Sequence, residues 1–178
     1  MVKRLSYILI AVVATLIVAA ILNPLSSADK DGKKSHEESR VVVKLHLKDG
    51  SKCGVCIEIA DTYQKRETGL SGVKSLDNYD GMLFPLSGTA GTSFWMKGVY
   101  FPIDLLFFKR DGKFISHQYM PTCLERNCDL FPIPQEAFWG LEIPSGPRLS
   151  SLTQALRLEI TGDNCAGHLL ADALLSDK

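Results

Sequence analysis

From residue 41 onward, turn-forming residues divide the sequence into short apolar segments. Several of these segments alternate apolar and polar residues, which is typical of half-buried strands and not of long helices. The first, VVVKLHLK, places Val43, Leu45 and Leu47 on one face and polar side chains on the other. The turn Asp-Gly and a second alternating segment, 54–60, follow it, so we expect these two segments to form a hairpin.

The rest of this region continues in the same way. A short helix is expected over 61–70, because Asp61 or Thr62 can cap its start and Gly69 can end it. A long loop is expected from 121 to 135. Further strands are expected at 81–86, 93–97, 103–109, 113–120, 137–143 and 155–160, with a helical turn at 148–154. The pattern predicts a mainly β (α+β) domain, a small compact barrel or sandwich with one or two short helices.

The N-terminus differs from this domain. Lys3 and Arg4 precede an uncharged apolar run at 5–22, which is long enough to cross a membrane and long for a signal peptide. We therefore expect an uncleaved anchor, although the small residues at 26–28 leave cleavage and secretion open. In both cases the basic N-terminus predicts that the domain lies outside the cytoplasm, on the periplasmic or extracellular side.

These features suggest four parts of the chain. Residues 1–22 form the anchor or signal segment, and 23–40 form a flexible tether rich in Ser, Gly and charged residues. Residues 41–163 form the β-rich domain, and 164–178 form a C-terminal tail. The net charge is zero, which argues against nucleic acid as a partner. The expected partners are the membrane, through the N-terminal segment, and a small polar ligand or an envelope protein; no cofactor is expected.

The segment TSFWMKGVYFPIDLLFFKRDG, residues 92–112, places two charged residues in apolar surroundings. Lys97 follows Phe94, Trp95 and Met96, and Asp104 lies between Ile103 and Leu105. A buried charge is costly unless it is paired or reaches water. The two side chains therefore either form a site or make a buried ion pair, Asp104 with Lys97 or with Arg66, that joins strands.

The order of several motifs resembles that of domain-of-unknown-function family 192, a group of small, often exported bacterial and archaeal proteins. These motifs are EIADTYQKRETGL, GMLFPL, FWMKGVYFPIDLLFFKRDGKF, MPTCLERNC and GLEIPSG, and they span about residues 52–163. The resemblance implies a compact β-rich fold and brings no established activity.

The family's motif residues can be placed on this sequence: Arg66, Gly69, Leu70, Gly81, Met82, Leu83, Phe84, Trp95, Met96, Lys97, Pro102, Asp104 and Glu142. Two departures stand out. Gly98 and Val99 replace the polar Asn-Thr pair that usually follows the lysine, and only Lys74 lies where an arginine is usual. If the family's site uses those polar groups, this protein binds a different ligand or binds it more weakly.

Arg66, Trp95, Lys97, Asp104 and Glu142 are the expected ligand-binding residues, since aromatic area beside a few fixed charges suits a small polar ligand. The first hypothesis is a membrane-anchored binding module outside the cytoplasm. The second is a cell-envelope enzyme that uses Asp104 or Glu142 as acid or base, with Lys97 or Arg66 stabilising charge. The third is a structural subunit of a membrane complex.

The chain has five cysteines. Cys123 and Cys128 close a short loop, and a disulfide is expected there in an oxidising compartment. Cys53 and Cys56 could pair only if a turn bends their strand, and catalytic redox chemistry is disfavoured without a helix N-terminus. Zinc held by these four cysteines is a weaker alternative. Cys165 is left odd and could pair outside the domain. No metal ligands are assigned to His46, His117 or His168.

Overall fold

The computed structural model describes residues 40–88, 92–123, 125, 127–147 and 150–165. The expected anchor, nearly all of the tether and most of the C-terminal tail lie outside the described residues. Within the described ranges, no helix has both the length and the apolar composition needed to cross a bilayer. The described elements are β1 (Arg40–Leu47), β2 (Lys52–Ile59), α3 (Tyr63–Thr68), β3 (Gly81–Pro85), β4 (Ser93–Trp95), β5 (Ile103–Phe108), β6 (Phe114–Met120), β7 (Leu130–Pro132), β8 (Trp139–Pro144), the 3-10 helix η1 (Ser150–Gln154) and β9 (Ala155–Ile160).

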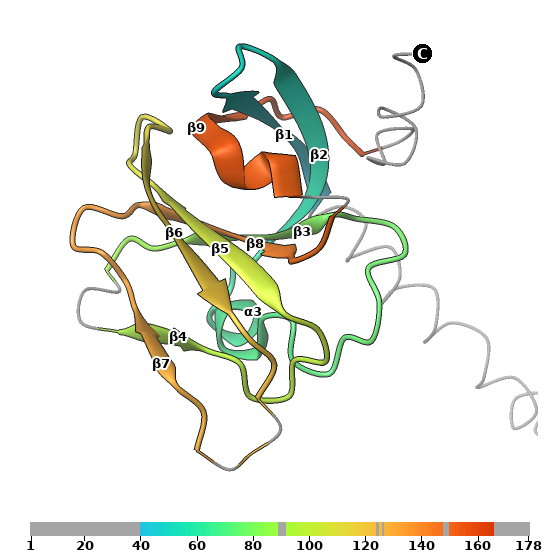
Figure 1. Cartoon of the computed structure of the whole chain (residues 1–178), viewed down its shortest axis with the longest axis vertical. Helices are drawn as coiled ribbons and strands as arrows, with labels where there is room; N and C mark the ends of the chain where they lie inside the picture. The colour runs from blue at the N-terminus through green and yellow to red at the C-terminus, as the bar shows by residue number, and fades with distance from the viewer. Residues whose placement is uncertain (1–39, 89–91, 124, 126, 148–149, 166–178) are drawn as a thin grey trace, which may run out of the picture. The chain divides into compact units, whose positions relative to one another are not determined.

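Seven strands form one sheet in the order β6-β5-β8-β3-β2-β1-β9 (Figure 1). The expected hairpin is confirmed, because β1 and β2 pair antiparallel with Val43 opposite Val55. Only β2 and β3 pair in parallel, among the described strands, and α3 lies in the connection between them. The mainly β prediction is therefore confirmed.

The large sheet curls into a half-barrel. The turn between β5 and β6 reaches β9 at the far edge of the sheet, where the Leu158 amide donates to the Gly112 carbonyl at 2.8 Å. Gly112 has a φ of +83°, and a β carbon there would lie 1.9 Å from the Leu158 carbonyl oxygen. Only glycine allows the two backbones to come this close.

Apolar side chains cover both faces of this sheet. One cluster includes Val43, Leu106 and Leu141 together with Leu152 of η1. The other lies on the opposite face and includes Met82, Phe84 and Phe107. Every residue of β5 is buried, because its side chains alternate between the two clusters.

A second sheet of two strands, β4 and β7, was only half expected. The sequence predicts β4, whereas β7 lies in the segment interpreted as a long loop. Pro132 ends β7, and prolines are usually read as loop residues because they cannot donate to a strand ladder. In Figure 1 this ribbon lies at the opposite end of the view from the β1–β2 hairpin.

The short helix α3 begins and ends where expected. Thr62 is the cap, because its side chain accepts a hydrogen bond from the Lys65 amide at 3.2 Å. Gly69 ends the helix with a φ of +50°. This helix carries several side chains of the site described below.

The cysteine pairing is partly as expected. Cys123 and Cys128 are bonded, with their Cα atoms 5.7 Å apart. Cys165, to which the sequence assigns no partner, is bonded to Cys56 of β2, 109 residues away. Cys53 is a free thiol whose pKa is raised by burial and by nearby Asp80. These two disulfides use three of the four sulfurs of the zinc alternative, so that site is not formed.

Candidate functional site

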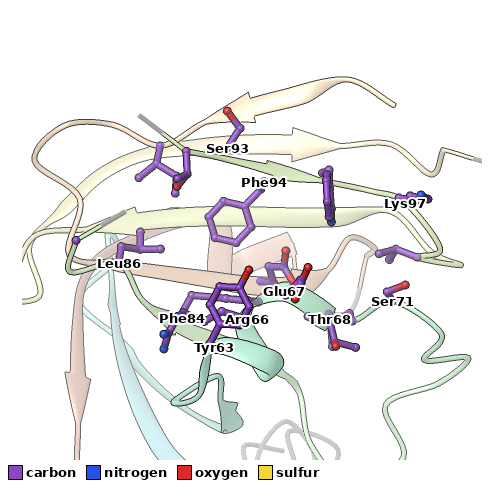
Figure 2. Close-up of a pocket in the computed structure, with 18 of the residues that line it drawn as sticks. Tyr63, Arg66, Glu67, Thr68, Ser71, Phe84, Leu86, Ser93, Phe94 and Lys97 are labelled. Atoms are coloured by element: carbon purple, nitrogen blue, oxygen red, sulfur yellow. The ribbon is translucent and has the colours of Figure 1, made fainter. Parts of the chain in front are cut away.

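A pocket of about 520 Å³ lies between α3 and β4. Tyr63, Arg66, Glu67 and Thr68 come from the helix, and Ser93, Phe94, Trp95 and Lys97 come from β4 and the residues after it. Phe84, Leu86 and Glu142 reach it from the large sheet. Figure 2 shows the Phe94 ring in the space between the strand and the helix, with Tyr63 on the helix side.

Phe94 positions β4 over the large sheet. Its ring packs edge-to-face against Phe84, with centroids 5.0 Å apart, and against Phe107 at 6.0 Å. Gly140 of β8 lies beneath it, and a β carbon there would be 3.2 Å from the Phe94 ring. The missing side chain at Gly140 lets the aromatic ring approach the sheet and form one wall of the pocket.

Glu142 is the acidic group at the base of the pocket. It lies in the middle of the sheet, opposite Met82 of β3 and Leu105 of β5, and it is only 5% exposed. Burial raises the pKa of its carboxyl from 4.5 to about 8. Among the residues that the structure describes, its carboxyl has no hydrogen-bond or ion-pair partner. At neutral pH it is therefore mostly protonated and can both donate and accept a hydrogen bond.

The Arg66 guanidinium is partly used for structure. Its Nη1 donates to the carbonyl oxygens of Asp61 at 3.0 Å and Ala60 at 3.4 Å. These bonds fasten α3 to the end of β2. Arg66 also lines the pocket, and its guanidinium has further N–H donors besides those at Nη1.

Lys97 is exposed at the pocket rim, and its backbone is held from two sides. It forms a bridge with Cys123 of the disulfide loop. The next residue, Gly98, has a φ of +75° and accepts from the Gly72 amide at 2.8 Å. A β carbon at Gly98 would lie 2.5 Å from Ser71 Oγ, and the positive φ is itself strained for any residue other than glycine.

Asp104 does not belong to this pocket, contrary to the expected patch with Lys97. Ile103 and Leu105 pack in the cluster on the pocket side of the sheet, so alternation directs Asp104 to the opposite face. There it is 6% exposed and bonded to His117 Nε2 at 2.7 Å. Neither the Lys97 nor the Arg66 ion pair considered for it is formed between these described side chains.

The structure thus brings together four of the five expected site residues: Arg66, Trp95, Lys97 and Glu142. Trp95 is 49% exposed beside them. The sequence interpretation missed the wall formed by Tyr63, Glu67 and Thr68 of α3. Tyr63, Arg66 and Glu67 have the spacing i, i+3 and i+4, which could have indicated a shared side of the helix.

The described residues contain no group of three or more His, Cys, Asp or Glu side chains that could hold a metal ion.

Comparison with known proteins identifies the family of the chain. Residues 45–152 match the model of family DUF192 (Uncharacterized ACR, COG1430). The chain belongs to DUF192. The resemblance noted in the sequence is therefore confirmed, and no curated protein matches the chain.

Two solved structures are similar in fold to this DUF192 protein. A "putative transcription regulator" from Sinorhizobium meliloti 1021 is 26% identical, with a TM-score of 0.56 over 70% of this chain and 95% of that one. A protein of unknown function from Novosphingobium aromaticivorans DSM 12444 is 21% identical, with a TM-score of 0.57 over 67% of this chain and 84% of that one. The second likeness shows the shared fold alone.

The structure explains the effect of the residue at two positions of the DUF192 motifs, Gly81 and Val99. A β carbon at Gly81 would lie 2.1 Å from the Glu142 carbonyl oxygen, so glycine allows β3 to pair closely with β8. Val99, which replaces a polar residue of the family pattern, is buried and lines the pocket. This departure makes the pocket wall near Lys97 more apolar than the family pattern implies.

Proposed function

We propose that this protein is a membrane-anchored binding module outside the cytoplasm, and that the pocket between α3 and β4 holds a small polar ligand. The observation that supports this best is Glu142, a buried carboxyl without a partner among the described residues, which opens into the pocket. Leaving a buried polar group unpaired costs about 1–3 kcal/mol. A ligand that pairs with Glu142 would recover that free energy.

The form of the pocket supports the same proposal. Ligand sites are typically concave and mostly apolar, with a few polar groups that orient the ligand. Here Phe84, Phe94 and Leu86 supply the apolar surface, and Glu142 and Lys97 supply polar groups at the base and the rim. A volume of about 520 Å³ lies within the usual range for ligand pockets.

The proposed location rests on the N-terminal sequence and on the disulfides. The apolar run at 5–22 suits a single-pass anchor. The two disulfides support an oxidising compartment, because such bonds are rare in the cytosol.

A second candidate is a cell-envelope enzyme with Glu142 as general acid. The observation in its favour is the pKa of about 8, because a general acid works best when its pKa lies near the working pH. Glu67 lines the same pocket and offers a second carboxyl. Asp104, the other acid considered from the sequence, lies on the opposite face of the sheet.

The test uses Trp95 as a reporter. Trp139, the other tryptophan, packs against the cluster on the opposite face, so Trp139→Phe leaves Trp95 as the single tryptophan. In that background, neutral, cationic and anionic small molecules are titrated while Trp95 emission is followed. We expect one class to change the emission, and Glu142→Leu to abolish the response.

Asp104→Asn serves as the matched control, because it alters a buried carboxylate outside the pocket and should leave the response intact. If no class of molecule changes the emission, the binding function is wrong. If a bound molecule is chemically converted and Glu142→Gln stops the conversion while the molecule still binds, the enzyme candidate replaces it.

A further inference from the structure

Resting on the binding function proposed above, we infer that the ligand is a neutral, hydroxyl-rich ring molecule of the saccharide class, with its hydroxyl groups bound by Glu142 and its ring against Trp95. The charge, the hydroxyl-bearing residues and the aromatic surfaces of the pocket each favour this class.

The charges on the pocket wall nearly cancel. Arg66 and Lys97 are cationic and Glu67 is anionic, while Glu142 at the base is mostly protonated at neutral pH. Arg66 also directs part of its guanidinium to backbone carbonyls. A strongly anionic ligand would lack a full set of cationic partners, and a cationic ligand would have to pass two positive side chains. The balance favours a ligand without net charge.

Four hydroxyl-bearing residues are among those that line the pocket. Thr68, Ser71, Ser87 and Ser93 come from α3 and three separate segments of the chain. In the described structure none of these four hydroxyls forms a side-chain hydrogen bond with another residue. A hydroxyl can donate and accept, as can a protonated carboxyl. Groups with both abilities match a ligand whose own hydroxyl groups donate and accept around a ring.

Aromatic surfaces complete the match. Trp95 is 49% exposed and Tyr63 is 71% exposed, and both line the pocket. Large exposed aromatic rings combine apolar contact area with a polar edge. A sugar ring presents C–H groups on its faces and hydroxyl groups at its edge, so one face can pack on an aromatic ring while the edge reaches Glu142.

The inference gives a specific pH dependence. A protonated Glu142 donates to a ligand hydroxyl, and a bound ligand removes the remaining water from its carboxyl, which further favours the protonated form. Affinity for a neutral sugar should therefore be constant below the pKa of about 8 and fall as the pH rises above it. A cationic ligand would show the reverse, because it needs the ionised carboxylate.

The experiment measures binding of D-glucose, N-acetylglucosamine and cellobiose to the full chain by calorimetry and by Trp95 fluorescence, across that pH range. Choline and citrate are the cationic and anionic probes. We expect at least one sugar to bind with a Kd on the order of 1 mM or tighter. Trp95→Ala and Glu142→Leu should each weaken it at least about tenfold.

Glu142→Gln is the sharpest variant, since its amide still donates and accepts but does not titrate. It should weaken sugar binding by less than about tenfold and remove the pH dependence. Asp104→Asn should leave the affinity for the sugar and its pH dependence unchanged. Circular dichroism spectra that match the parent confirm that each variant is folded.

Two results overturn the inference in different ways. If choline or citrate binds and the sugars do not, the saccharide class is wrong while the binding function stands. If none of these probes and none of the molecules in the broader fluorescence titration binds, the inference and the binding function both fail.

Discussion

Gly69, at the end of α3, faces Glu142 of β8 across the base of the pocket. A β carbon at Gly69 would lie 4.0 Å from Oε2 of Glu142 and 3.5 Å from the Phe84 ring. The glycine has a φ of +50°, so it ends the helix and leaves the carboxyl open to the pocket at the same position. Gly69 therefore leaves the space beside the buried acid free of a side chain.

The buried Glu142 predicts a dependence of stability on pH. Its pKa is raised from 4.5 to about 8 in the folded state, so the folded protein holds a proton that the unfolded chain releases. The stabilising contribution of the protonated Glu142 is fully present below pH 4.5 and is lost as the pH rises to about 8. Above that pH, this group causes no further change in stability. The loss should be on the order of a few kcal/mol. Urea unfolding of the parent and Glu142→Gln, at pH values below and above this window, measures it.

Glu142→Gln should lack this loss of stability, so its free energy of unfolding relative to the parent should increase as the pH rises. Glu67→Gln is the matched control, because Glu67 lines the same pocket and its side chain is exposed. Equal pH slopes for the parent and Glu142→Gln would contradict the burial of an acidic proton at this position.

Asp104 should contribute to stability and not to ligand binding. Its bond to His117 is made at a buried position, so Asp104→Asn replaces a carboxylate acceptor beside a histidine and should cost about 1–3 kcal/mol. Thermal unfolding gives the loss of stability, and Trp95 fluorescence gives binding. A variant that keeps its stability but loses binding would place Asp104 in the site after all.

The two disulfides should differ in their effect on stability. The Cys56–Cys165 bond spans 109 residues and the Cys123–Cys128 bond spans 5. Loop entropy in the unfolded chain predicts about 5 kcal/mol for the long loop and about 2 kcal/mol for the short one. Paired Cys→Ser variants, compared by denaturant unfolding, test this order. A larger loss from Cys123→Ser with Cys128→Ser would show that the short loop stabilises β4 and β7 beyond its entropy.

Closure of the half-barrel should depend on Gly112. Gly112→Ala should be destabilised because the φ of +83° is strained for alanine and its β carbon collides with the Leu158 carbonyl. Gly50→Ala is the matched control, with a φ of +86° and no atom within 4 Å of the new carbon. Both should lose about 1–2 kcal/mol from backbone strain, and Gly112→Ala should lose more. Equal unfolding free energies would show that the contact with β9 contributes little.

The N-terminal segment should keep the protein in the membrane fraction. Fractionation of cells, followed by N-terminal sequencing of the product, checks this expectation. A soluble exported product that begins at Asp29 would reject the anchor and keep the extracytoplasmic location. A full-length product in the cytosol would reject both.

Much of the fold follows from local patterns in the sequence. Alternation in β1 determines which of its faces is buried, and Thr62 and Gly69 mark the ends of α3, because these features depend on neighbouring residues alone. The Cys123–Cys128 bond is also local, since the short loop keeps the two sulfurs near each other. Tyr63 and Glu67 were missed as pocket residues because a helix pattern does not show what faces it.

Tertiary structure decided the rest. The sequence shows Asp104 and Glu142 as two acids in apolar strands, and only the packing of the sheet directs Glu142 into the pocket and Asp104 to His117 on the other face. The partner of Cys165 lies 109 residues away, at a separation where no local pattern indicates proximity. Alternation determines which side chains share a face of a strand. What covers that face depends on distant segments, and this is why the pKa of Glu142 could not be read from its neighbours in the chain.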